Sequence, residues 1–481
     1  MARKAEMGRR LLWFITTASV LAMVVPPALA VVPVPIAASA LNAPPGAMAE
    51  ATIAADAAHP GHLAAAADPY LDPVRIVVVL SDDAGATWSP PITVIPDGYA
   101  KSYDPALAFD NDGSVVVVGG ASGQGAPHCQ PASSIFVATV SGDQIGYDVI
   151  RDTRDDAAYV DRPGLAVKAS GAVRTFVTWT ESRGVAPECR ATPLRSTIML
   201  ARLDAARKVL DVHALPPGGL GAPFGATMAL SANGTLDVAV GDHGNGSGRL
   251  VVVTSSDEGA TMSPPFVVDE GPDVPLTVPG IGGVVTPVPS IATGGGRVAV
   301  AWNKEGPSGT EAAVFDSGGG DEWHALGSPS PELPEILPTL TYDRTGHLWS
   351  LVGRPADGQV NYTLYRMDDA WGPGVSVGGG PSTGFPEIGE GFGLVSTGDQ
   401  VVAAVPIDGP TGSSLSIAGV ATAGPTDSTL DPPPSAPRPA AAPNAGRAPP
   451  RSRGLLVVGV GAVVLSVAAA AAAVTRVRRR R

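Results

Sequence analysis

The chain has 481 residues and a formal net charge of −13 at pH 7. Five arginines lie within the last six residues, so the rest of the chain is still more acidic, which argues against nucleic acid or an anionic surface as a partner. The 59 glycines and 48 prolines, with only 5% aromatic residues, are typical of a turn-rich all-β fold. Lysine is scarce beside abundant alanine, arginine, glycine and proline, as in a bacterial genome of high GC content.

The first thirty residues are predicted to be a signal peptide. Four basic residues within the first ten precede the apolar run LLWFITTASVLAMVV, and Ala28-Leu29-Ala30 is a small-x-small cleavage site. We therefore expect export and cleavage after Ala30, with an uncleaved anchor as the alternative. Residues 31–69 are rich in alanine and proline and are expected to be disordered, which places the start of an ordered head at Tyr70.

Between residues 70 and 424, an apolar segment, a turn that contains glycine and a more strongly apolar segment follow one another six times. Apolar runs bounded by Gly, Asp and Pro predict β-strands. The repeats are 51 to 63 residues apart, which is typical of the four-stranded units of a β-propeller. Their turn glycines are Gly113, Gly171, Gly234, Gly295, Gly346 and Gly398.

A second hairpin accompanies each repeat and completes its four-stranded unit. Five of these outer hairpins follow their inner hairpin, whereas the sixth, in residues 75–95, comes first in the chain, and its inner hairpin, in residues 391–405, comes last. The pattern therefore predicts an all-β, six-bladed β-propeller in which the N- and C-terminal strands share one blade and close the ring. The apolar segment 414–421 is left over and keeps seven blades as the alternative.

The two cysteines lie in similar contexts, APHCQ around Cys129 and APECR around Cys189, between the second and third strands of adjacent blades. An exported protein meets an oxidising compartment, so we expect a disulfide bond between them. A zinc site is the alternative, with His128 beside Cys129, but two cysteines and one histidine do not form a spaced ligand set. We accordingly expect no metal and no cofactor.

The C-terminal end is predicted to anchor the chain in a membrane. Residues 425–453 are rich in proline and are expected to form an extended stalk. Residues 454–475 form an apolar segment long enough to cross a hydrocarbon core of about 30 Å as a single transmembrane helix. The arginine-rich tail 476–481 should stay in the cytoplasm under the positive-inside rule. This order predicts a single-pass protein of the cell membrane, whose head, residues 70–424, is extracellular.

The turn SDDAGATW recurs in the chain as SSDEGATM. Both copies are expected to join the third and fourth strands of a blade, and their aspartates can accept hydrogen bonds from N–H groups of the same turn. Their glycines can adopt a positive φ without steric cost. The shared positions are Ser81, Asp83, Gly85, Thr87 and Trp88 in the first copy and Ser255, Asp257, Gly259 and Thr261 in the second, where Met262 replaces the aromatic residue.

These positions resemble the Asp-box, or BNR repeat, of sialidase-like β-propellers of the secreted bacterial type. The phrases YDPALAFDNDG and VDRPGLAV also resemble the starts of blades in that family. The resemblance implies a propeller whose Asp-boxes lie on the face opposite the active site. A sialidase of this family is expected to hold a substrate carboxylate with three arginines, to attack through a tyrosine activated by a glutamate, and to use an aspartate as acid and base.

The sequence departs from that pattern at the first arginine. The Arg-Ile-Pro motif of the family is replaced by Arg75-Ile76-Val77, on the strand that leads directly into the first box. Three other arginines could form an anion clamp, since guanidinium groups suit carboxylates, and two acidic residues of one blade could act as a glycosidase pair. These candidates are Arg162, Arg183 and Arg354 for the clamp and Asp161 with Glu181 for the pair; Asp104, Asp242 and His243 are further candidates for binding on the same face.

The segment DNDG, residues 110–113, hints at a calcium loop, but it lacks the ligand spacing of an EF-hand and favours a turn.

Because the Arg-Ile-Pro motif is missing, we expect a non-catalytic module of the cell surface that binds a glycan or a cell-envelope protein. One alternative is an exo-α-sialidase-type glycoside hydrolase that acts on surface or environmental glycans. Another is a structural protein of the envelope without a specific ligand. Whether the head is an enzyme is left open by the sequence.

Overall fold

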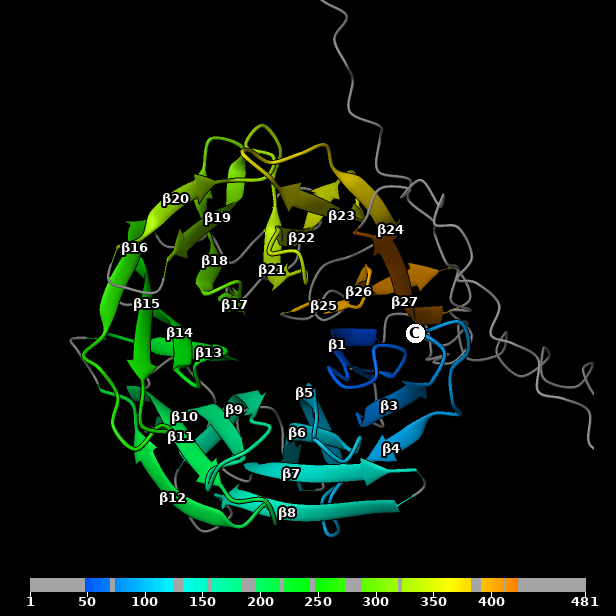
Figure 1. The fold of residues 1–481 in the computed structure, drawn as a ribbon, viewed down its shortest axis with the longest axis vertical. Helices are drawn as coiled ribbons and strands as arrows, with labels where there is room; N and C mark the ends of the chain where they lie inside the picture. Colours follow the sequence, from blue (N-terminus) through cyan, green and yellow to red (C-terminus); the bar gives the residue numbers. More distant parts are fainter. Residues whose placement is uncertain are drawn as a thin grey trace, which may run out of the picture. The chain divides into compact units, whose positions relative to one another are not determined.

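The computed structural model describes residues 48–69, 74–123, 133–142, 144–153, 158–183, 195–216, 220–242, 247–272, 288–318, 322–381, 391–409 and 412–422. All of them belong to the compact unit Met1–Thr426. Their strands form seven antiparallel sheets that are arranged around a centre as the blades of a propeller (Figure 1). None of these described residues belongs to a helix that is long and apolar enough to cross a bilayer.

The chain runs through the blades in order, and each blade is hydrogen-bonded in the order of its strands. Blade 1 contains β1 (Met48–Ala55), β2 (Leu63–Pro69), β3 (Ile76–Ser81) and β4 (Ile92–Val94). Blade 2 contains β5 (Lys101–Phe109), β6 (Val115–Ser122), β7 (Ser133–Ser141) and β8 (Gln144–Asp152). Blade 3 contains β9 (Ala158–Val167), β10 (Thr175–Arg183), β11 (Arg195–Leu203) and β12 (Val209–Ala214).

The remaining four blades follow the same plan, except that the last one has three strands. Blade 4 contains β13 (Pro223–Leu230), β14 (Leu236–Asp242), β15 (Ser247–Ser255) and β16 (Phe266–Pro272). Blade 5 contains β17 (Ser290–Gly294), β18 (Arg297–Gly306), β19 (Gly309–Ser317) and β20 (His324–Gly327). Blade 6 contains β21 (Ile336–Tyr342), β22 (Leu348–Ala356), β23 (Gln359–Met367) and β24 (Val375–Pro381), and blade 7 contains β25 (Gly393–Thr397), β26 (Gln400–Gly409) and β27 (Gly412–Ala421).

The burial of each strand follows from its place in the blade. The second strands lie between two neighbouring blades, so both of their faces are covered; every residue of β14 is buried, and so are the first seven of β6. Strands covered on both faces have continuous apolar sequences. The outer strand β12 instead alternates between half-buried and exposed residues, because one of its faces meets solvent.

The prediction of six blades with a shared terminal blade is wrong, because the structure has seven blades. Strand β3 pairs with β2, so β3 and β4 share a sheet with β1 and β2, which lie in the segment 31–69 that the composition marks as disordered. The C-terminal hairpin forms its own sheet together with the leftover segment 414–421. The physical reason is side-chain size: the four alanines at positions 64–67 of β2 are completely buried, and they fill the space beside the next sheet without the bulk that marks a strand in a sequence.

The ring closes where blade 1 packs against blade 7, and Figure 1 shows β1, in blue, beside the orange strands of blade 7. Ala51 and Ile53 of β1 share a hydrophobic cluster with Val402 and Ala404 of β26. A Cβ added to Gly393 of β25 would lie 2.8 Å from the backbone nitrogen of Ile53, so the two strands approach more closely than a larger residue allows. Among the described strands no hydrogen-bonded ladder joins the two blades, so apolar packing closes the ring.

Several predicted features lie outside the described residues. They are the signal peptide 1–30, the stalk 425–453, the apolar segment 454–475, the tail 476–481, both cysteines of the expected disulfide (Cys129 and Cys189), and His243. All of these stay predictions.

Candidate functional site

The first strands of five blades carry a β-bulge with one residue in the left-handed region. A bulge bends the strand and redirects a side chain, and for a residue other than glycine the left-handed backbone costs about 1 kcal/mol or more. Three of these residues precede a proline. The left-handed residues, with φ between 52° and 68°, are Glu50, Asp104, Arg162, Gly225 and Leu337.

The charged members of this series meet in a central cavity of about 280 Å³. Glu50 of β1, Asp104 of β5 and Arg162 of β9 form one side of its lining. Apolar groups of other blades, including Met228, Val288 and Phe392, complete the lining. The cavity therefore combines a few converging polar groups with an apolar wall, as binding sites for small molecules do.

Arg162 lies among three carboxyl groups and is only 13% exposed. Its Nη1 lies 3.0 Å from Oε1 of Glu50 and 3.6 Å from Oδ1 of Asp104, and its backbone N–H donates to Oδ2 of Asp104 at 3.2 Å. Asp68 of β2 is fully buried and does not line the cavity, but its carboxyl completes a trio with Glu50 and Asp104 in which one oxygen of each lies within 4.8 Å of the others. Such a trio could hold a cation, but here the guanidinium already supplies the positive charge.

The cluster separates the pKa values of its carboxyl groups. Burial, and then the charge of Asp104, raise the pKa of Glu50 and of Asp68 well above the usual range. Burial alone would also raise the pKa of Asp104, but the Arg162 guanidinium and a hydrogen bond from Glu50 lower it to about 2. No donor among the described residues reaches Oε2 of Glu50 or Oδ1 of Asp68, which suits carboxyl groups that keep their protons. With its lowered pKa, Asp104 is thus the ionised partner of Arg162, whereas the raised pKa of Glu50 favours its protonated form.

Two tyrosines, Tyr103 and Tyr159, lie beside this cluster and are hydrogen-bonded to each other. Burial, and then the charge of Asp161, raise the pKa of both phenols well above the usual range. A phenol with a raised pKa is a weak nucleophile at neutral pH, since little phenolate forms. Gly120 of β6 leaves the space that the Tyr103 ring fills, because an added Cβ would overlap that ring.

The predicted pair of carboxylates, Asp161 and Glu181, is not brought together. Across β9 and β10, Asp161 is opposite Thr180, whereas Glu181 is opposite Val160, so the two acidic side chains leave opposite faces of the sheet. A hydrogen bond links the carboxyl of Asp161 to Asp104 instead. Glu181 forms an ion pair with Arg151 at 3.0 Å. Sequence spacing within one blade therefore does not show which carboxyls face each other.

The three arginines predicted to form an anion clamp are also separated. Only Arg162 lines the cavity among the described residues. The side chain of Arg183 is 70% exposed and lies 2.7 Å from Glu181. Nη1 of Arg354 donates to the hydroxyl of Tyr365 at 3.1 Å, within blade 6.

Asp242, predicted as a binding residue, is occupied by contacts within its own blade. Its Oδ1 accepts hydrogen bonds from the backbone N–H groups of Gly221 and Ala222 at 2.9 and 2.8 Å. Its Oδ2 lies 2.5 Å from Arg249, and the residue is 1% exposed. Asp242 therefore holds the start of β13 and the end of β14 in place.

Glu50 and Asp68 escape the sequence analysis because they lie in a segment assigned to disorder. Two signals were available. The run MAEATIAA alternates small and polar residues at the start of β1. The charged residues of YDPAL and DRPGL, Asp104 and Arg162, take the same bulge position in the adjacent blades 2 and 3. The recurrence of a polar residue before proline predicts the site better than the charge of a residue alone.

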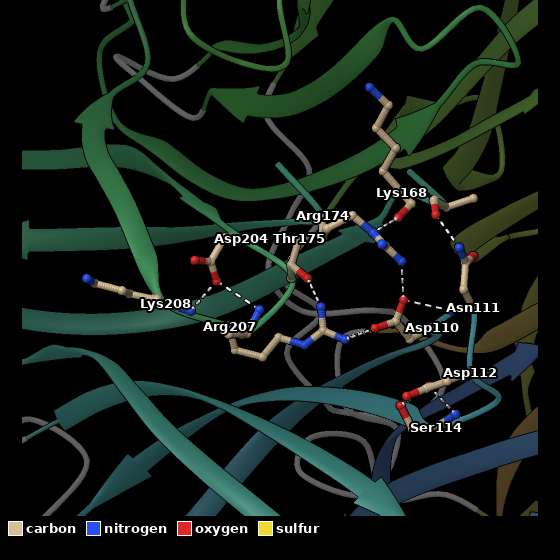
Figure 2. Close-up of polar contacts among 12 residues, drawn as sticks. Asp110, Asn111, Asp112, Ser114, Lys168, Arg174, Thr175, Asp204, Arg207 and Lys208 are labelled. Atoms are coloured by element: carbon tan, nitrogen blue, oxygen red, sulfur yellow. Dashed lines mark hydrogen bonds and ion pairs between the residues drawn. The ribbon is translucent and has the colours of Figure 1, made fainter. Parts of the chain in front are cut away.

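The segment DNDG forms a brace between blades 2 and 3, as Figure 2 shows. Oδ1 of Asp110 accepts from Nη2 of Arg174 at 2.8 Å, and Oδ2 accepts from Nη2 of Arg207 at 2.5 Å. Arg207 also donates to Oγ1 of Thr175 at 2.6 Å. Asn111 donates to the carbonyl of Ala169 in the next blade. Two guanidinium groups thus take the place that a cation would have at this turn.

The two eight-residue turns join β3 to β4 and β15 to β16, and they have the same hydrogen bonds. In the first, Oγ of Ser81 accepts from the N–H of Gly85 at 2.8 Å and donates to Oδ1 of Asp83 at 2.9 Å. Both carboxylate oxygens of Asp83 accept from Thr87, at 2.8 Å from its N–H and 2.7 Å from its hydroxyl. The corresponding distances in the second turn are 2.8, 2.7, 2.9 and 2.6 Å. No atom of either turn lines the cavity among the described residues.

These turns and the cavity lie at opposite ends of the blades. In blade 1, Ser81 is opposite Leu63, which is opposite Ala55 at the last position of β1. Glu50 lies near the first position of the same strand.

A larger groove, of about 740 Å³, lies between blades 4 and 5 and includes Asp237 and Trp323. It lacks the converging charged groups of the central cavity, so the central cavity is the better candidate.

No known protein family and no curated protein matches the sequence. The fold is similar to the solved structure of a Trypanosoma rangeli sialidase mutant with trans-sialidase activity, with 14% identity and a TM-score of 0.41 over 78% of this chain and 54% of that chain. It is also similar to the Ruminococcus gnavus intramolecular trans-sialidase, with 13% identity and a TM-score of 0.42 over 81% of this chain and 98% of that chain. A third similar structure is an ulvan lyase, with 8% identity and a TM-score of 0.49 over 79% of this chain and 94% of that chain. The chain thus spans about half the length of the trypanosomal sialidase. The structural neighbours include sialidases and another carbohydrate-acting enzyme at low identity, and this likeness concerns the fold alone.

Proposed function

We propose that the propeller head binds a carbohydrate in its central cavity. The observation that carries this proposal is the composition of the cavity lining, which has Glu50, Asp104 and Arg162 on one side and apolar groups on the other. A sugar ring offers hydroxyl groups at its rim and C–H groups on its faces, so it matches both sides. The volume of about 280 Å³ lies just below the range of about 300–1,000 Å³ for small-molecule pockets, which suits one sugar unit at the end of a glycan.

The charges of the cluster favour a neutral sugar over an anionic one. Arg162 is the one guanidinium in the described lining, and the ionised Asp104 balances it. Burial raises the pKa of Glu50 and of Asp68, which favours their neutral, protonated forms. A ligand carboxylate would therefore meet no net positive charge, whereas sugar hydroxyls could donate to Asp104 and accept from Arg162.

The geometry also favours binding over hydrolysis. Glycosidases keep their two carboxyl groups about 5 to 9.5 Å apart, so that the glycosidic bond lies between them. Glu50 and Asp104 are hydrogen-bonded to each other, which leaves no room for a bond between their carboxyls. The exo-α-sialidase alternative also lacks support from a clamp of three arginines, since Arg183 and Arg354 do not line the cavity.

We further propose that this head is displayed outside the cell and is held there by the apolar C-terminal segment. The support is the order of sequence features: an export signal in residues 1–30, a proline-rich stalk in residues 425–453 and an apolar segment in residues 454–475. Protease shaving of intact cells, followed by detection of the head, tests this location. Retention of the head inside the cell would contradict it.

The binding proposal is tested by screening the purified full chain on an array of neutral and sialylated glycans. We expect binding to neutral glycans and an increase of at least tenfold in Kd for Arg162→Lys, which keeps the charge but loses the forked donor. Thr227→Trp should have a similar effect, because it fills the cavity from the β13 side without touching the charged cluster.

The matched control is Arg183→Lys, which makes the same exchange at an exposed arginine outside the cavity and should leave binding unchanged. Thermal unfolding of each variant shows whether the fold is retained. Equal glycan binding by the wild type and both cavity variants would contradict the proposal. Turnover of an aryl sialoside that Arg162→Lys abolishes would establish the sialidase alternative instead.

A further inference from the structure

The turn between β1 and β2, residues 56–62, brings a carboxylate and two imidazoles together. It lies at the end of β1 that is remote from Glu50, so it is separate from the central cavity. Asp56, His59 and His62 are spaced three residues apart, and one ligand atom of each lies within 4.8 Å of the others. We propose that these three residues bind a divalent transition-metal ion of the zinc class.

The distances within the cluster match those between neighbouring ligands of one ion. Oδ2 of Asp56 lies 2.8 Å from Nδ1 of His59 and 3.6 Å from Nδ1 of His62. Zinc binds nitrogen and oxygen ligands at about 2.0–2.2 Å, which places adjacent ligand atoms of a tetrahedral site about 3.3–3.6 Å apart. The two imidazole rings are stacked, with centroids 4.9 Å apart and planes inclined by 22°. To admit the ion, the contact between Asp56 and His59 must open by about 0.5 Å, and the stacked rings must turn so that both Nδ1 lone pairs point to it.

The backbone of the turn holds the three ligands in place before any ion binds. The N–H of Asp56 donates to the carbonyl of His62 at 3.0 Å, and the N–H of His62 donates to the carbonyl of His59 at 2.7 Å. Oδ1 of Asp56 accepts from the N–H of Ala58 at 2.8 Å, so Oδ2 is the oxygen turned toward the histidines. A ligand set that is already ordered loses little conformational entropy on binding.

Exposure and ligand type indicate which ion fits. The side chain of Asp56 is 6% exposed, whereas those of His59 and His62 are 60% and 38% exposed, so an ion can enter from solvent and keep water in its remaining positions. Two imidazoles and one carboxylate suit zinc, nickel, cobalt or copper, whereas calcium and magnesium prefer oxygen ligands. Nε2 of His62 lies 4.0 Å from Oδ1 of the exposed Asp82, beyond hydrogen-bond distance, so this carboxylate contributes a nearby negative charge and no hydrogen bond.

The turn lies where blades 1 and 7 meet, so a bound ion would stabilise contacts between these two blades. The carbonyl of Gly61 accepts from the N–H of Ala84 at 2.8 Å, within blade 1. The carbonyl of Pro60 accepts from the hydroxyl of Thr397 in blade 7. Fixing the turn therefore supports contacts on both sides of the seam. An ion that binds the folded chain and not the unfolded one raises the unfolding temperature.

The test uses the full chain, without a polyhistidine tag, and Zn²⁺ as the probe in isothermal titration calorimetry. We expect one Zn²⁺ per chain and at least a tenfold weaker Kd in His59→Gln and in His62→Gln. His324→Gln is the matched control, because it changes an exposed histidine of β20. Zn²⁺ should raise the unfolding temperature of the wild type and of His324→Gln, and the rise should be lost in His59→Gln and His62→Gln.

A spectroscopic measurement identifies the ligand atoms. In the proposed complex, both imidazoles bind through Nδ1 and keep the proton on Nε2, which ¹⁵N chemical shifts of the histidine rings report. Absence of stoichiometric Zn²⁺ binding would overturn the proposal. So would a Kd that is the same in the wild type, His59→Gln and His62→Gln. Neither result bears on carbohydrate binding, since the cavity is at the other end of the blade.

Discussion

Two buried networks of arginine and carboxylate join neighbouring blades, and they differ in the ratio of guanidinium to carboxyl groups. At the DNDG turn, one carboxylate, Asp110, lies between two guanidinium groups, and each of its oxygens accepts from one of them (Figure 2). In the central cavity, one guanidinium, Arg162, lies among carboxyl groups that include Glu50 and Asp104. The first network has a donor for each carboxylate oxygen, whereas the second keeps buried oxygens that no donor reaches among the described residues.

The comparison shows how a brace differs from a site. Burial is similar: the side chains of Asp110 and Asp104 are 11% and 10% exposed. The difference lies in the supply of donors and in the space next to the charges. Asp110 has a matched donor at each carboxylate oxygen, whereas Glu50 and Asp104 line a cavity and have divergent pKa values. Groups whose pKa values diverge at a cavity are candidates for function.

The largest effect is expected from breaking the brace. Asp110→Ala leaves the guanidinium groups of Arg174 and Arg207 without their shared carboxylate, and the removal of one partner of a buried ion pair costs about 3 kcal/mol. Urea unfolding of the full chain measures the change in free energy. Asp148→Ala, at an exposed position of β8, should change stability by less than about 0.5 kcal/mol. Equal effects of the two changes would show that the network does not stabilise the ring.

A smaller effect, dependent on pH, is expected from Glu50→Gln. A carboxyl whose pKa is raised in the folded protein takes up a proton on folding, so its stabilising effect is full below the unfolded pKa of about 4.3 and is lost as the pH rises toward the folded pKa. We expect stability to fall as the pH rises above the unfolded pKa toward the raised folded pKa, with a slope of at most about 1.4 kcal/mol per pH unit for each such group. Glutamine mimics the protonated acid, so Glu50→Gln should reduce that slope.

Asp104→Asn is the matched comparison for this slope. The pKa of Asp104 is about 2, so its contribution is present above about pH 3.9 and is lost only as the pH falls toward 2. Asp104→Asn should therefore lower stability throughout pH 5 to 8 without removing the slope that Glu50 causes. Urea unfolding at several pH values measures both variants. An unchanged slope in Glu50→Gln would mean that Glu50 is ionised in the folded protein.

The smallest effect is expected at the repeated turns, whose hydrogen bonds are local. Ser81→Ala removes one acceptor and one donor within the turn, and a loss of about 1 kcal/mol is expected. Ser255→Ala should cause a loss of the same size, because the distances in the two turns agree. Thermal unfolding of the two variants provides the measurement. A loss as large as that of Asp110→Ala would show that these turns also support contacts between blades.

Five of the blades follow from the hairpin pattern, because their second strands carry the bulky apolar runs that mark a buried strand. Blade 1 does not, because its second strand consists mostly of alanine, and composition alone cannot separate a buried alanine strand from a linker. That error also moves the C-terminal hairpin into the wrong blade. The candidate site is predicted only in part: Asp104 and Arg162 are on the expected face, whereas Glu50 and Asp68 are missed with the strands that carry them.

The sequence by itself determined the features whose contacts are local. The hairpins and the repeated turns belong here, since Ser81 bonds to Gly85, four residues away. The tertiary structure alone decided the number of blades and the make-up of the cavity. Arg162 meets Glu50 across 112 residues of chain and Asp104 across 58, and such meetings depend on how many sheets the ring contains before it closes. Local chemistry sets each turn, whereas packing between blades decides which charges come together.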